Sequence, residues 1–130
     1  MKDYCKVYMP IDINKLRPNL EQASKQDIYI YQRKISSMLY AANITWLDVA
    51  RTASKLSKFS QNPLPTHDAA ATRAIVYLYQ MKTLAIEYLN ENIKNHIFAK
   101  ASNAVFGDNS VSKKSTEGYL FTLYKGPIDW

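Results

Sequence analysis

Few side chains in this sequence are placed to do covalent or metal chemistry. The single cysteine is Cys5, and neither histidine, His67 or His96, has a partner at a spacing typical of a nucleophile and its base. We expect a surface role for each of these three residues. A zinc site is not expected, because it needs a cluster of cysteine and histidine ligands. The three glycines form no phosphate-binding loop, and no two aspartates are adjacent as in a polymerase metal motif. The sequence therefore predicts no metal ligands and no catalytic nucleophile.

Basic side chains are the more informative feature. Arg51, Lys55 and Lys58 follow one another at the helical spacing i, i+4, i+7, so they share one face of a predicted helix. Residues 25–60 hold six basic and two acidic side chains, which is +4 of the chain's net charge of +6. A positive surface favours phosphate partners, although an ordinary solvated helix face explains the same pattern. The candidate nucleic-acid-binding residues are Arg33, Lys34, Arg51, Lys55 and Lys58.

Three helices are expected to carry these residues. Apolar side chains recur at helical spacing over three ranges, about 25–42, 46–60 and 67–82. Polar residues with capping character begin each helix, namely Ser24, Thr45 and Thr66. Short connections between matched apolar faces predict a compact antiparallel unit. Half-buried packing is the expectation for the helical tyrosines, which are Tyr29, Tyr31, Tyr40, Tyr77 and Tyr79.

The texture of the sequence changes after Thr83. The stretches LAIEYL, HIFAKASNAVF and GYLFTLYKG are strand candidates, and Gly107–Ser110 has the composition of a turn. We therefore predict an α+β fold in which about three helices precede a short β-hairpin or small sheet. The predicted division is an extended lead-in at residues 1–23, a helical segment at 24–83 and strands at 84–130. The lead-in has two prolines and no sustained period, so loose packing is expected there.

Bulk composition limits the setting of the protein. Hydrophobic residues make up 47% of the chain, which is enough for a core, and no apolar run approaches the about 18 residues of a membrane span. The first five residues lack the apolar stretch of a signal peptide, and one cysteine cannot form an internal disulfide. We therefore expect a cytoplasmic or nuclear protein that is not secreted and has no membrane partner.

The spacing of Tyr31, Ile35, Ser37 and Tyr40, and the later stretch KKSTEGYLFTLYKGPIDW, resemble segments of copia-type LTR retrotransposon polyproteins, particularly fungal ones. The end of reverse transcriptase in that family has the pattern Tyr-x-x-x-Ile-x-Ser-x-x-Tyr, matched here by Tyr31, Ile35, Ser37 and Tyr40. A later Leu-Ser-x-Phe-x-x-Asn-Pro turn is matched by Leu56, Ser57, Phe59, Asn62 and Pro63. The stretch KKSTEGYLFTLYKGPIDW is similar to the first strands of the family's ribonuclease H domain. The resemblance covers about residues 9–130.

The resemblance implies thumb and connection helices at 24–83, then ribonuclease H-like strands. The family's activity is two-metal hydrolysis of the RNA strand of an RNA–DNA hybrid, with Mg²⁺ as cofactor. The aspartate of its Ser-Asp-Ala strand binds metal, but this chain has Asn103, which brings no charge to a site built from carboxylates. Asp108 matches a loop acid rather than the principal ligand. We therefore expect no catalytic residue, no metal site, no bound cofactor and no enzymatic activity. The family's Arg-Pro is also replaced by Trp46-Leu47, which leaves Thr45 to cap the second helix.

A retrotransposon-derived fragment that binds nucleic acid weakly is the function that the sequence predicts. The expected partner is an RNA–DNA hybrid or another nucleic acid. Two alternatives stay open: a domesticated protein-interaction module and a decayed relic without function. Salt-dependent binding to a hybrid favours the first reading, whereas a stable oligomer favours the interaction module.

Overall fold

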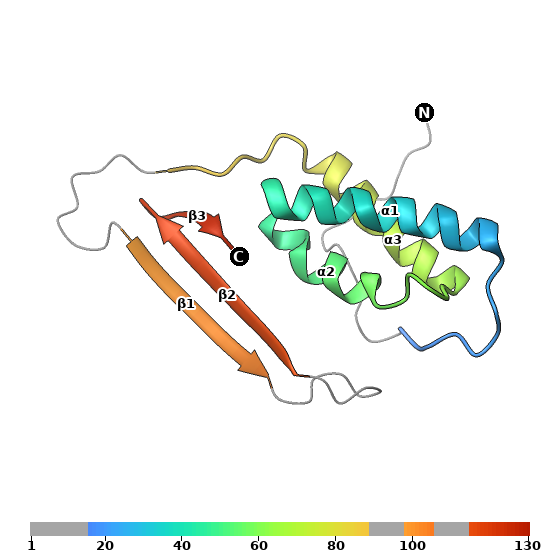
Figure 1. The fold of residues 1–130 in the computed structure, drawn as a ribbon. Coiled ribbons are helices and arrows are strands. Elements are labelled where there is room, and N and C mark those ends of the chain that lie inside the picture. The colour runs from blue at the N-terminus through green and yellow to red at the C-terminus, as the bar shows by residue number, and fades with distance from the viewer. Residues whose placement is uncertain (1–15, 89–97, 106–114) are drawn as a thin grey trace. The chain divides into compact units, whose positions relative to one another are not determined.

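The computed structural model describes residues 16–88, 98–105 and 115–130 of the chain, and Figure 1 shows their fold. Within these ranges three helices precede a three-stranded antiparallel sheet, which confirms the predicted α+β fold. The helices are α1 (Lys25–Ile44), α2 (Leu47–Ser57) and α3 (Pro65–Gln80), and the strands are β1 (Phe98–Val105), β2 (Thr116–Leu123) and β3 (Gly126–Asp129). The chain divides between Leu84 and Ala85 into two compact units. No helix among the described residues is long and apolar enough to cross a membrane.

The three helices pack in antiparallel succession around a shared apolar core (Figure 1). Tyr31, early in α1, donates a hydrogen bond of 2.8 Å from its hydroxyl to the carbonyl of Leu56, late in α2. The hydroxyl of Tyr77, late in α3, donates to the carboxylate of Asp48 at the start of α2. Both pairs join opposite ends of successive helices, as the short connections lead one to expect. The buried hydrophobic residues are Tyr31, Ile35, Met38, Ala42, Val49, Ala53, Leu56, Ala71, Ala74 and Tyr77.

The starts of the first two helices differ in how they are capped. Ser24 caps α1 as predicted, because its side chain accepts a hydrogen bond of 3.1 Å from the backbone N–H of Asp27. The predicted cap of α2 was wrong: the N-cap is Trp46, and it offers no side-chain hydrogen bond. The reason is that α1 continues to Ile44, so Thr45 closes that helix instead and bonds its N–H to the carbonyl of Ala41 at 3.1 Å.

The third helix begins two residues earlier than predicted, with Pro65 in its first turn and Leu64 as N-cap. This start places His67 where its Nδ1 accepts a hydrogen bond of 3.0 Å from the backbone N–H of Leu64. The imidazole is fully buried and stacks on the ring of Phe59, with 3.9 Å between ring centroids. The expected surface role of His67 was therefore wrong, because its ring serves as the cap of α3.

The segment before α1 has no helix or strand in residues 16–23, but it is not loosely packed. The side chain of Asn62 makes four hydrogen bonds to it. The amide oxygen accepts from the side chain of Asn19 at 3.4 Å and from the backbone N–H of Ala23 at 2.8 Å. The amide nitrogen donates to the carbonyls of Asn19 at 3.2 Å and Glu21 at 2.9 Å. Leu16 also packs against the helical core. The expectation of loose packing is therefore wrong for these residues; residues 1–15 lie outside the described ranges.

The sheet has the strand order β1-β2-β3. Leu84–Tyr88 forms no strand, contrary to expectation; instead the hydroxyl of Tyr88 donates a hydrogen bond of 2.8 Å to the carbonyl of Pro127. The predicted strand GYLFTLYKG is two strands, because Tyr124 and Lys125 have φ of 49° and 64°. Two successive residues with positive φ reverse the chain in a tight hairpin turn. The predicted turn at 107–110 lies outside the described residues.

Candidate nucleic-acid interface

The basic face of α2 comprises Arg51, Lys55 and Lys58, the last lying one residue beyond the helix end. The opposite face of α2 is buried in the core through Val49, Thr52, Ala53 and Leu56. Arg51 and Lys58 are exposed and Lys55 is half-buried, as expected for residues about half a turn away from the buried ones. None of the three cations forms an ion pair within residues 16–88, 98–105 and 115–130. A rigid helix thus presents three positive charges to solvent on one side.

Lys34 has a different environment from the cations of α2. Its ammonium group bonds both carboxylate oxygens of Asp68 on α3, at 2.7 and 2.8 Å, and the hydroxyl of Thr72 at 3.0 Å. Its side chain is only 25% exposed. The charge of Lys34 is therefore offset by a carboxylate, and all three ammonium donors are used to join α1 to α3.

Arg33 lies on the outward face of α1, directly opposite the buried residues of that helix. Its guanidinium carbon is 5.8 Å from the centre of the Tyr29 ring, a cation–π geometry. The five predicted residues therefore fall into three places. Three form the basic face of α2, Arg33 joins an aromatic residue on α1, and Lys34 is an internal tie to α3.

The helical tyrosines divide into a buried and an exposed group. Tyr31 and Tyr77 are at most 9% exposed. Tyr29, Tyr40 and Tyr79 are 61%, 72% and 65% exposed, so the expectation of half-buried packing was wrong for these three. A helical projection of the sequence already contains the signal, because Tyr29 and Tyr40 fall on the side of α1 opposite Tyr31.

The two buried phenols are hydrogen-bond donors that hold the helices together rather than acid–base groups. Burial raises the pKa of Tyr31, and the negative charge of Asp68 adds to that effect. The hydrogen bond to Asp48, together with burial, raises the pKa of Tyr77 to about 12. Both hydroxyls therefore stay protonated at neutral pH and keep donating to their partners on α2.

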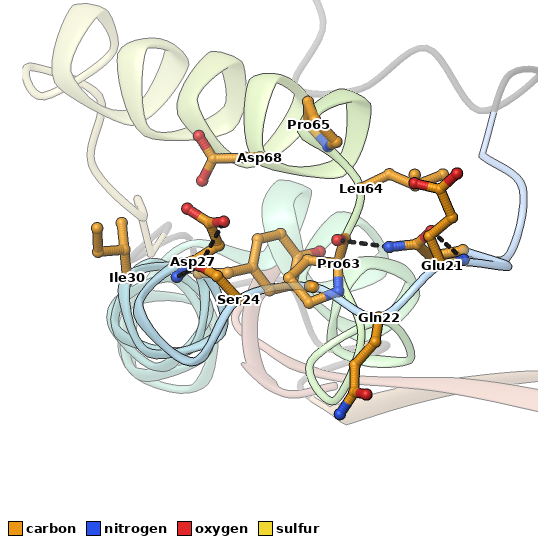
Figure 2. Close-up of a pocket in the computed structure, with 12 residues that line it drawn as sticks. Glu21, Gln22, Ser24, Asp27, Ile30, Pro63, Leu64, Pro65 and Asp68 are labelled. Carbon is orange, nitrogen blue, oxygen red and sulfur yellow. Dashed lines mark hydrogen bonds between the residues drawn. The ribbon is translucent and has the colours of Figure 1, made fainter.

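A hollow of about 450 Å³ opens between residues 19–24 and the first turns of α1 and α3 (Figure 2). Three carboxylates line it, those of Glu21, Asp27 and Asp68. Asp27 accepts a hydrogen bond of 2.6 Å from the Ser24 hydroxyl, and Asp68 pairs with Lys34. Acids in the first turn are placed favourably with respect to the helix dipole, but they repel phosphate. This hollow is therefore unsuited to a nucleic-acid backbone.

Asn103 lies on β1, directly opposite Gly118 of β2. Successive residues of a strand point to opposite faces, so Glu117, which pairs with Ala104, lies on the other face of the sheet. Asp129 shares that other face, because it pairs with Phe121 and its carboxylate lies 3.5 Å from the hydroxyl of Tyr119.

This arrangement does not fit a Mg²⁺ site. The two carboxylates of the sheet point away from the face that carries Asn103, and divalent metals need several oxygen ligands that converge. Within the described ranges no group of three or more His, Cys, Asp and Glu side chains could hold a metal ion. Asp108 lies outside those ranges.

Comparisons with known proteins give two relatives. The chain is 30% identical over 100 residues to secreted RxLR effector protein 161 of Plasmopara viticola, an alignment that covers 77% of this chain and 69% of that protein. It is 28% identical over 106 residues to a transposon Ty5-1 protein of Saccharomyces cerevisiae, covering 81% of this chain and 33% of that protein. The chain thus spans only about a third of the transposon protein. No family model matches the chain, and no solved structure matches it. The second relative identifies a retrotransposon-related protein.

The first relative contradicts the expected localisation. A cytoplasmic or nuclear protein that is not secreted was expected, but the relative from Plasmopara viticola is named as a secreted protein. The expectation was wrong because it rested on the first five residues and on a single cysteine. Neither feature argues against export. The single cysteine does not, because apolar packing holds this helical core together without any disulfide.

Proposed function

This chain belongs to the same family as secreted RxLR effector protein 161 of Plasmopara viticola, and from that premise we propose that it is a nucleic-acid-binding module of retrotransposon origin. In this proposal the helical unit descends from the thumb and connection of a copia-type reverse transcriptase. The strands descend from the start of the adjoining ribonuclease H domain. The module binds RNA–DNA hybrid or other nucleic acid without cutting it.

The observation that carries the proposal is the basic face of α2. Its three cations have no carboxylate partner among the described residues, and the helix that bears them is fixed by four buried side chains. Cations held at fixed spacing on a rigid element neutralise phosphates at little entropic cost. The paired Lys34 is not part of the proposed interface, because its charge is already offset by Asp68.

Absence of catalysis is part of the same proposal. Asn103 replaces the metal-binding aspartate of the family that the sequence resembles, and the nearby carboxylates Glu117 and Asp129 lie on the other face of the sheet. One neutral amide oxygen does not offset the charge of two divalent ions. These observations support a binding role rather than hydrolysis.

A charge-reversal experiment tests the proposed interface. In Lys55→Glu/Lys58→Glu, two of three phosphate contacts become repulsive, so the affinity for a labelled RNA–DNA hybrid should fall by about tenfold or more at low salt. The matched control is Lys34→Gln, which removes a cation of α1 that already has a partner. It should leave affinity unchanged even though it lowers stability. A loss of affinity in the control as large as that in the double variant would mean that binding does not depend on the basic face of α2, and the proposal would fail.

A second candidate function is protein interaction, in line with the name of the relative from Plasmopara viticola, a secreted effector protein. The observation that favours it is the number of large apolar side chains left in solvent on α1, including Tyr40 at 72% and Ile44 at 57% exposure. This second candidate function includes secretion of the chain. Analytical ultracentrifugation measures whether the chain forms a stable oligomer, and this result distinguishes the two candidate functions. A stable oligomer that does not bind hybrid would favour this one.

A further inference from the structure

The outward face of α1 carries an aromatic stripe that the basic face of α2 does not explain. The stripe consists of Tyr29, Arg33, Tyr40 and Ile44, all of them exposed. At 3.6 residues per turn these positions fall within an arc of about 60°. The buried residues Tyr31, Ile35, Met38 and Ala42 lie on the opposite side of the helix. The stripe therefore lies on the side of α1 that faces away from the helical core.

The chemistry of the stripe selects one kind of partner. No acidic residue lies in the arc, since the single carboxylate of α1, on Asp27, is about a third of a turn away from Arg33 and bonded to Ser24. Arg33 is held against the ring of Tyr29, with 5.8 Å between its guanidinium carbon and the ring centre. Exposed aromatic rings interleaved with a cation are suited to bases that stack and to the phosphates that join them.

We propose that Tyr29, Arg33 and Tyr40 form a platform on which bases of single-stranded nucleic acid stack. This inference rests on the proposed function and deepens it by naming the form of nucleic acid that is preferred. The two tyrosines are eleven positions apart along the helix, which is about 16 Å, or about five nucleotides of a stacked strand. The bases of a duplex are paired inside it and cannot lie on these rings. The platform therefore favours single strands, whereas the basic face of α2 attracts any nucleic-acid backbone.

Leucine substitutions test the platform on the full chain. Tyr29→Leu/Tyr40→Leu keeps apolar bulk but removes both rings, so the affinity for a labelled 20-nucleotide single strand should fall by about tenfold, with hairpin-duplex affinity unchanged. Tyr29→Phe/Tyr40→Phe keeps the rings and should bind like the original protein. Tyr79→Leu is the matched control, because Tyr79 is 65% exposed and has a cation, Lys82, 4.7 Å from its ring centre, but lies on α3. It should not change affinity.

The outcomes separate this inference from the function on which it rests. If the leucine double variant binds single strands as tightly as the original protein, while Lys55→Glu/Lys58→Glu weakens binding, the platform is wrong and the interface on α2 stands. Equal weakening towards single strand and duplex would also overturn the platform. Absence of any nucleic-acid binding by the wild-type protein would overturn both the platform on α1 and the interface on α2. A dimer that the leucine variant converts to monomer would show that the stripe binds a second copy of the chain instead.

Discussion

The imidazole of His67 accepts a hydrogen bond at Nδ1, so a neutral ring carries its proton at Nε2. Burial lowers its pKa from the usual 6.5, and the backbone of Arg17 opposes that shift only in part. Protonation in the folded state would add a second N–H at the position that accepts from Leu64. It would also place a positive charge at the positive end of α3. The folded protein therefore favours the neutral ring.

Stability should fall with acid because of this histidine. Its folded pKa lies below its unfolded pKa, so the unfolded chain binds the proton more readily. Its contribution is complete above about pH 6.5 and is lost as the pH falls through the folded pKa, by at most about 1.4 kcal/mol per pH unit. Urea unfolding followed by circular dichroism at pH 7.5 and 5.5 measures this loss. His67→Gln keeps an acceptor at the cap without titrating, so it should reduce the pH dependence. An equal acid loss in both proteins would show that His67 is not the source of the effect.

Restoring a single carboxylate should not restore hydrolysis. Asn103→Asp supplies one charge on its face of the sheet, while Glu117 and Asp129 remain on the other face. Two divalent ions need several converging carboxylates, so purified Asn103→Asp should leave a labelled RNA–DNA hybrid intact with Mg²⁺ or Mn²⁺. Gel electrophoresis of the RNA strand checks this. Cleavage by the variant that disappears on adding Asp108→Asn would contradict the expectation.

At the scale of elements, the connection before α3 does more than join two helices. Asn62 is matched by the Asn-Pro turn of the resemblance, and its amide makes four hydrogen bonds to residues 19–23. This use of both donors and both acceptor positions leaves the amide fully satisfied. Asn19 adds a further hydrogen bond of 3.1 Å from its side chain to the carbonyl of Pro63.

Removal of the Asn62 amide should release the segment before α1. Asn62→Asp keeps the shape but loses both donors, and Asn62→Ala loses all four bonds. We expect a cost of about 1–3 kcal/mol for either, since each net hydrogen bond contributes about 1 kcal/mol and such bonds are not additive. Hydrogen exchange at the Ala23 amide should accelerate in Asn62→Ala, which removes its acceptor, more than exchange in the middle of α1. Unchanged protection at Ala23 would show that other contacts hold the segment.

The helices were predictable because their apolar residues repeat at helical spacing over more than ten residues each. The ends of the helices were not predictable, because a cap depends on where the neighbouring helix stops. Thr45 is the C-cap of α1 instead of the N-cap of α2, and α3 begins at Pro65 instead of at residue 67. The basic face of α2 was predictable because its three cations follow one another at helical spacing. The partner of Lys34 was not, because Asp68 is 34 residues away and only packing brings them together.

At the scale of the whole molecule, the cations behind the net charge of +6 lie in different environments. Lys34 of α1 forms an ion pair with Asp68 of α3, while the three cations of α2 have no carboxylate partner among the described residues. The sheet unit carries an exposed cation of its own, Lys100 on β1. If the proposed interface is right, binding depends on the helical unit and not on charge wherever it occurs.

A charge reversal on the sheet distinguishes these cases. Lys100→Glu changes the net charge by two units, but Lys100 belongs to the other compact unit of the chain and not to the proposed interface. If the phosphate contacts are made by the basic face of α2, this variant should bind hybrid within about twofold of the wild-type protein, because all three cations of that face are kept. Fluorescence anisotropy measures both affinities. A loss as large as that of Lys55→Glu would point to a non-specific effect of net charge.

The salt dependence of hybrid binding tests the proposed interface most directly. Three phosphate contacts predict a slope of about −3 for the logarithm of the binding constant against the logarithm of salt concentration. Removal of two contacts in Lys55→Glu/Lys58→Glu predicts a slope of about −1 or shallower. Titrations of a labelled hybrid from low to moderate salt give both slopes. A wild-type slope near −3 that flattens in the double variant is the predicted result, and an identical slope in the two proteins would contradict a nucleic-acid interface on α2.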